Sequence, residues 1–117
     1  MKDKEYLKAN GFNVELALES LNDLDMYNEI LYDFISDNKE EKLTENIKNK
    51  DIKKYILFVH NLKSECSYLG IEKLASMATI HQEKAENHDY EYIQNNIEEL
   101  INEIKKVNKV AKTYLSK

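Results

Sequence analysis

The sequence predicts an all-α protein, an antiparallel up-down four-helix bundle with a short additional N-terminal helix. The first observation is composition: the chain has no proline and only two glycines, so few helix breakers are present. The second is that apolar residues recur at three- and four-residue steps through most of the chain. The third is that short turns separate the long amphipathic segments, which makes neighbouring helices antiparallel. With 117 residues, we expect one domain, 1–117, with one core.

The N-terminal third of the sequence predicts short helices. Residues 1–10 are polar, and we expect them to be frayed or loosely helical. Asn13 is a suitable N-cap for a short helix over residues 14–21, which would cover one end of the bundle. The next helix begins near Leu24, and its apolar stripe consists of Tyr27, Ile30, Leu31, Phe34 and Ile35. Beyond Asn38 the stripe changes phase, which allows either a kink there or the start of another short helix.

Three longer helices complete the predicted bundle. The first has Asp51 as its cap and ends at Gly70 in a left-handed C-cap. Its apolar stripe consists of Ile52, Tyr55, Ile56, Val59, Leu62, Cys66 and Leu69. The second follows Gly70, and its apolar face consists of Ile71, Leu74, Ala75, Ala78 and Ala85. The third follows a turn at residues 87–89, runs from about Tyr90 to Tyr114, and repeats Ile93, Ile97, Leu100, Ile104, Val107 and Ala111.

Composition and charge argue against several classes of protein. The net charge is −5 and no basic cluster offsets it, which disfavours a nucleic-acid binder. No apolar run approaches the length of a membrane span and the N-terminus lacks a signal-peptide core, so we expect a soluble cytoplasmic protein. Cys66 is the single cysteine, which leaves no disulfide framework and no thiolate metal site, and its place on the apolar stripe predicts a core residue.

His60 has the most suggestive surroundings of any polar residue in the sequence. It projects about 120° from the middle of the apolar stripe, so it should face water at the edge of the bundle. Lys63 lies between His60 and the stripe, and Ser64 and Ser67 flank the ring with little bulk. A neutral imidazole near pH 7 is a competent nucleophile. The pattern indicates an accessible nucleophile, a cation for an anion, and a cleared surface beside them.

This run resembles the histidine phosphotransfer (HPt) domains of bacterial phosphorelays. Their signature is His-x-Leu-Lys-Gly, with a second glycine ten residues after the histidine. Here it reads His60-Asn61-Leu62-Lys63-Ser64, and Gly70 closes it. The likeness extends from about residue 11 to about residue 107, with the elements in the order of the family.

The sequence departs from the signature at two positions. Ser64 stands where the family usually has glycine, and because serine is small we expect activity to survive. Glu65 replaces a small residue, but it should point well away from His60.

The resemblance implies a phosphorelay phosphocarrier. His60 would accept a phosphoryl group from the aspartate of one receiver domain and pass it to another receiver, and Lys63 would meet the phosphoryl oxygens as a point charge. The partners would be response-regulator receiver domains, with a hybrid histidine kinase as a further candidate. Neither nucleic acid nor a membrane would be a partner. The receiver would supply Mg²⁺, so the chain itself needs no cofactor. No ATP-binding segment is visible, so we expect that the protein has no autokinase activity and is not an enzyme. We also expect it to be a monomer.

A partner must reach the ring of His60, which predicts a docking patch around it. The patch consists of Leu57, Ser64, Ser67 and Tyr68. On the following helix, many HPt domains have a polar residue at the position of Gln82 that forms a hydrogen bond near the histidine ring. For Gln82 the sequence leaves this role and a solvent-facing side chain equally open.

Two other kinds of protein fit parts of the sequence. One is a non-catalytic helical interaction module in which His60 is incidental. The other is a metal-binding bundle that uses His60 and His81, although no carboxylates stand at the Glu-x-x-His spacing of di-iron bundles. His81 falls on an apolar face, which favours a satisfied, partly buried ring. The sequence does not identify the receivers or the direction of phosphoryl flux; its start at Met1 favours a free-standing protein.

Overall fold

The computed structural model describes residues 3–116, and within that range the secondary structure is entirely helical. The helices are α1 (Lys4–Ala9), α2 (Val14–Leu21), α3 (Leu24–Ser36), α4 (Lys39–Lys48), α5 (Ile52–Leu69), α6 (Glu72–Glu86) and α7 (Tyr90–Leu115). Strand-like pairing between residues 3 and 116 is limited to one isolated antiparallel bridge between Phe12 and Ile71. The predicted fold class, all-α, is confirmed.

Polar side chains start most of these helices. Asn13 accepts a hydrogen bond from the backbone N–H of Leu16 at the start of α2, and Asp51 accepts one from Lys54 at the start of α5. Both predicted caps are therefore confirmed. Three further caps of the same kind start α1, α3 and α7, namely Asp3, Asp23 and Asp89.

The N-terminal residues are more ordered than the sequence indicated. Instead of one short N-terminal helix there are two, α1 and α2, and Leu7 of α1 is completely buried. Of the two states expected for residues 1–10, frayed or loosely helical, residues 4–9 adopt the helical one, and residues 1–2 lie outside the described range. A helix of six residues has little stability of its own, so its burial against α2 and α7 holds it in place.

The chain is divided into two helices near Asn38, which decides between the two possibilities that the phase change left open. Helix α3 ends at Ser36, Asp37 is extended (φ −83°, ψ 134°), and α4 begins at Lys39. An extended residue between two helices allows α4 to turn its apolar side to the core in a new phase. Leu43 is buried as a result.

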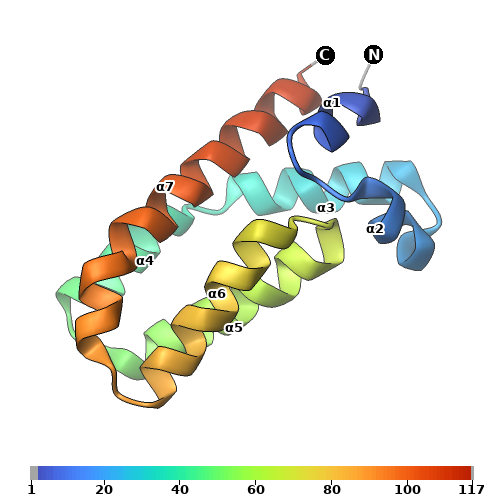
Figure 1. The fold of residues 1–117 in the computed structure, drawn as a ribbon. Coiled ribbons are helices and arrows are strands. Elements are labelled where there is room, and N and C mark those ends of the chain that lie inside the picture. Colours follow the sequence, from blue (N-terminus) through green and yellow to red (C-terminus); the bar gives the residue numbers. More distant parts are fainter. Residues whose placement is uncertain (1–2, 117) are drawn as a thin grey trace.

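Helices α5 and α6 lie side by side (Figure 1). Helices α5 and α6 run in opposite directions on either side of Gly70, and α7 returns along α6. Helix α7 also packs against α3 and α4, both of which contact α5. Within residues 3–116, no Cα atom of α5 comes within 8 Å of one in α7, and the same holds for α6 and the α3–α4 segment. One core of buried apolar side chains therefore lies between α3–α4, α5, α6 and α7.

Helix α2 and the residues before it cover the turn where α5 meets α6, and α1 packs against α2 and α7. The backbone N–H of Asn13 donates to the carbonyl of Gly70 (2.7 Å), and the hydroxyl of Tyr27 donates to the carbonyl of Leu69 (2.7 Å). Gly70 has φ +74° and is the predicted left-handed C-cap. These bonds fix the end of α5 to the N-terminal part of the chain, so the helix that carries His60 is held at a defined position.

None of the helices in the described part of the chain combines the length and the apolar character needed to cross a membrane.

Candidate functional site

His60 lies in the middle of α5 and its side chain is exposed. No residue between 3 and 116 forms a hydrogen bond with its ring. Its backbone carbonyl accepts a hydrogen bond from the Ser64 hydroxyl (3.2 Å), which turns that small side chain back onto the helix. Both ring nitrogens therefore face solvent, as an accessible nucleophile requires.

Lys63 lies on the side of α5 that faces α6. Glu65 contacts α4, and Lys63 is about 160° further around the helix by the rotation of 100° per residue, so it lies on the opposite flank. The side chain is half-buried, and its ammonium group forms no ion pair within residues 3–116. Lys63 is one turn from His60, so its charge is available for an anion bound at the ring.

Gln82 lies on α6 at about the level of His60. The two residues are twelve and ten positions from Gly70 on antiparallel helices, and each residue advances both helices by about 1.5 Å. The ammonium of Lys84 lies over the Tyr92 ring of α7, and Gln82 is about 160° around α6 from Lys84, so Gln82 lies on the flank toward α5.

Of the two roles left open for Gln82, the hydrogen bond with the ring of His60 is not formed in the described part of the chain. Instead, Oε1 of Gln82 is buried and no described residue donates to it. Gln82 is half-buried, so the solvent-facing alternative does not describe it either. A buried amide oxygen without a donor carries an unfavourable free energy, which a water molecule or a turn of the side chain toward His60 would relieve.

The predicted docking patch of Leu57, Ser64, Ser67 and Tyr68 is exposed as a whole. Leu57 retains 59% and Tyr68 54% of their accessible surface, which is high for large apolar side chains. Ser64 and Ser67 are exposed between them. The outer face of α5 therefore offers a small-residue surface beside His60 with two apolar groups at its margins.

The outer face of α5 also has a distinctive charge. Its exposed residues include Lys53, which is about 20° around the helix from His60, and the helix contains a single acidic residue, Glu65, on the flank toward α4. In a protein of net charge −5, the described residues that α5 contributes to this face are basic or uncharged, with no carboxylate among them. This face is suited to an anionic group.

His81 has a hydrogen-bond partner, as its position on the apolar face predicted, but it is a core residue, more deeply buried than the partly buried ring expected. It is 2% exposed, and its Nδ1 lies 2.7 Å from the Tyr55 hydroxyl. The ring of Tyr92 meets it edge-on, with centroids 5.6 Å apart. Burial lowers the pKa of His81, with a smaller opposing effect from the charge of Glu99. His81 faces inward and His60 outward, so the structure does not bring the two predicted candidates for a metal site together.

Cys66 is completely buried, which confirms its predicted place in the core. Burial raises the pKa of its thiol, so the thiolate form is strongly disfavoured.

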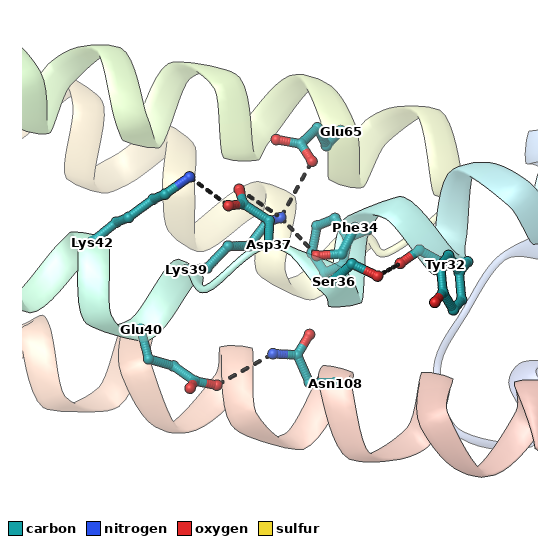
Figure 2. A network of polar contacts seen from close by, with 9 residues as sticks. All are labelled: Tyr32, Phe34, Ser36, Asp37, Lys39, Glu40, Lys42, Glu65 and Asn108. Carbon is teal, nitrogen blue, oxygen red and sulfur yellow. Dashed lines mark hydrogen bonds and ion pairs between the residues drawn. The ribbon is translucent and has the colours of Figure 1, made fainter.

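Sequence reasoning missed Lys39, which is 1% exposed. Figure 2 shows its ammonium between Phe34, Asp37 and Glu65, at the junction of α3 and α4. A signal was present: Lys39 precedes Leu43 and Ile47 by four and eight residues, so it occupies the apolar phase of α4.

Comparisons with family models, curated proteins and solved structures found no match to this chain. The resemblance to HPt domains therefore rests on the residues themselves.

Proposed function

We propose that this protein is an HPt phosphocarrier that receives a phosphoryl group on His60 from the aspartate of a receiver domain and passes it to another receiver. The observation that supports the proposal is the exposed ring of His60, with the ammonium of Lys63 one turn away, neither of which has a partner among residues 3–116. In this proposal α3 with α4, α5, α6 and α7 are the four antiparallel helices of the bundle, and α1 and α2 cover one end.

The chemistry needs one nucleophilic nitrogen and one neutralising cation. The lone pair of an imidazole nitrogen attacks the phosphorus of the receiver's aspartyl phosphate, a P–N bond forms, and the acyl P–O bond breaks. The electron pair of that bond leaves with the aspartate carboxylate, so atoms and charge balance. The Lys63 ammonium lies near the phosphoryl oxygens, and phosphoryl transfer depends mainly on positioning and charge neutralisation. Receiver-bound Mg²⁺ acts on the partner's side of the reaction.

The partners in this proposal are receiver domains, with a hybrid histidine kinase as a further one. The protein would act as a cytoplasmic monomer. The docking patch around His60 supports a protein partner, because its small and apolar residues leave space for an incoming surface.

The decisive experiment is incubation with receivers charged by acetyl phosphate, followed by measurement of label on this chain. Acid-labile, base-stable label is expected on the parent protein, none on His60→Gln, and parental label on the exposed control His88→Gln. Label that persists on His60→Gln would remove His60 from the mechanism. His60→Gln should also melt within a few degrees of the parent, since the side chain is exposed.

The position of the docking patch has its own test. Ser64→Arg should block transfer from a receiver by bulk, while phosphoramidate, which needs no docking, should still label His60. Ser64→Gly should be at least as active as the parent. Parental transfer from the receiver to Ser64→Arg would show that the partner docks elsewhere.

The same exposed patch would also serve a non-catalytic interaction module, whose docking residues would be Leu57 and Tyr68. The labelling experiment separates the two functions, because such a module would bind a partner without acquiring phosphate from any receiver.

A further inference from the structure

The junction of α3 and α4 contains a buried positive charge. The ammonium of Lys39 donates to the carbonyl of Phe34 (2.8 Å) and lies 4.0 Å from the centre of the Phe34 ring. It forms ion pairs with Oδ2 of Asp37 (3.5 Å) and Oε2 of Glu65 (3.4 Å). Figure 2 shows that the side chain of Glu65 extends from α5 to this ammonium at the start of α4.

A buried ammonium requires compensating carboxylates, because an unpaired charge in the interior is strongly unfavourable. Asp37 is shared, since its other oxygen pairs with the exposed Lys42. Glu65 has no ion pair except that with Lys39 within residues 3–116. Lys39 therefore depends on Glu65, and the position of the Glu65 carboxylate is in turn determined by Lys39.

Glu65 borders the outer face of α5 that carries His60. Its side chain is 42% exposed, and it is only about 40° around the helix and one turn along it from the exposed Asn61. A small cavity of about 130 Å³ between α4 and α5 is lined by both of these residues and by Lys39. Without the ion pair, the Glu65 carboxylate could move outward over Asn61 and bring a negative charge to a face that otherwise carries none.

We propose that Lys39 is a positioning residue for phosphoryl transfer: it holds Glu65 against α4 and so keeps the docking face around His60 free of negative charge. This inference rests on the proposed function. A phosphoryl group carries a charge of about −1.5 to −2. A carboxylate about 8 Å from that group in water would repel it by enough to slow transfer about fivefold. The Debye length is about 8 Å at physiological ionic strength, so added salt should remove much of the effect.

The test measures the rate of label transfer from a charged receiver to four variants at low salt and at about 0.5 M salt. Lys39→Met should be about fivefold slower than the parent at low salt and close to it at high salt. Glu65→Gln should transfer at the parental rate, and the double variant Lys39→Met with Glu65→Gln should recover that rate. Lys48→Met is the matched control, because it removes the same charge from α4 at an exposed position.

A double variant as slow as Lys39→Met, or a Lys39→Met protein with the parental rate, would overturn the proposal. If the parent itself acquires no label, the proposed function fails, and this inference fails with it. Failure of the inference alone therefore has a different signature, a labelled parent without recovery in the double variant.

Because Lys39→Met removes a buried charge that pairs with Asp37 and Glu65, a second pair of variants tests the same idea in a protein whose ion pairs are intact. Asn61→Asp places a carboxylate directly on the docking face with no change in shape, and Asn61→Gln is its uncharged control. Asn61→Asp should be about fivefold slower at low salt, and salt should restore the rate. An unchanged rate would show that the face tolerates a carboxylate, and the proposal would be wrong.

Discussion

At the scale of single residues, the three histidines differ in what surrounds their rings. His60 is exposed and has no partner within residues 3–116, whereas Nδ1 of His88 lies 2.9 Å from the Tyr90 hydroxyl. His81 is enclosed by Tyr55 and Tyr92. Helical phase was sufficient to predict which of His60 and His81 faces water, because the phase depends only on position in the sequence.

Lys63→Ala should slow phosphoryl transfer to His60 and shorten the lifetime of the phosphohistidine without abolishing either. One contact between a lysine and a phosphate near the surface contributes roughly 1–3 kcal/mol, which changes a rate but does not eliminate it. The measurement is the transfer rate and the decay of label, with Lys48→Ala, at an exposed position on α4, as control. Equal rates in the Lys63→Ala protein and the parent would show that Lys63 is only a solvated side chain.

The stability of the protein should decrease as the pH falls below about 6.5, because of His81. Burial lowers the pKa of His81 in the folded state, so the unfolded chain binds a proton at a higher pH than the folded chain does. The stabilising contribution is therefore complete above the unfolded value and is lost as the pH falls toward the folded one. Urea unfolding at pH 7 and pH 5 measures the difference.

The matched variants for this pH dependence are His81→Leu and His88→Asn. His81→Leu should flatten the dependence between pH 7 and pH 5, although it leaves the Tyr55 hydroxyl without its partner. His88→Asn should retain the parental dependence, since it removes an exposed ring, and asparagine tolerates the positive φ of that position (59°). An identical slope for His81→Leu and the parent would assign the pH effect to other groups.

At the scale of elements, α5 is fixed at both ends, by the Asp51 cap and by the contacts of Gly70. Gly70 is needed for two reasons: its φ is +74°, and a Cβ there would lie 2.2 Å from the backbone oxygen of Asn13. The sequence predicted the left-handed cap but not the close approach, because the second requires knowing that α2 begins against this turn.

Gly70→Ala should therefore destabilise the protein by more than the roughly 1–2 kcal/mol of a left-handed alanine, since Asn13 must also move. Gly11→Ala is the control: its φ is +91°, but nothing lies within 4 Å of the added Cβ. Urea unfolding compares the two. Equal losses of stability would mean that the contact with Asn13 is readily relieved, and that α2 does not restrain the end of α5.

The junction of α3 and α4 shows where sequence reasoning stops at this scale. The change of apolar phase revealed a discontinuity near Asn38, but a kink and a break produce the same pattern in sequence. Lys39 was missed because lysine is seldom buried, even though it precedes Leu43 by one turn on the buried face. Its burial depends on Glu65 of another helix, and a partner that distant is not visible in local periodicity.

At the scale of the whole molecule, the all-helical architecture and most of the core of α3, α5, α6 and α7 could be predicted from spacing alone. The stripes of α5, α6 and α7 are repeated over several turns, so their phase is unambiguous. Helix α1 is different, because one buried leucine, Leu7, in a six-residue helix gives no repeat to recognise. Tertiary packing against α2 and α7 decides its structure.

Cys66 allows the cooperativity of this core to be measured. It is the single cysteine, it is completely buried, and burial raises the pKa of its thiol. A thiol reagent such as DTNB should therefore modify the native protein only through opening of the structure around α5. If opening requires global unfolding, the free energy of opening from the modification rate should equal the free energy of unfolding from urea.

The control for that measurement is Cys66→Ala combined with Ser67→Cys, which moves the thiol by one residue to the exposed outer face of α5. This protein should react with DTNB at nearly the rate of a free thiol, whatever its stability. Rapid modification of Cys66 in the parent would show that α5 opens locally. The helix that carries His60 would then be held less firmly than its contacts with α2, α3 and α6 indicate.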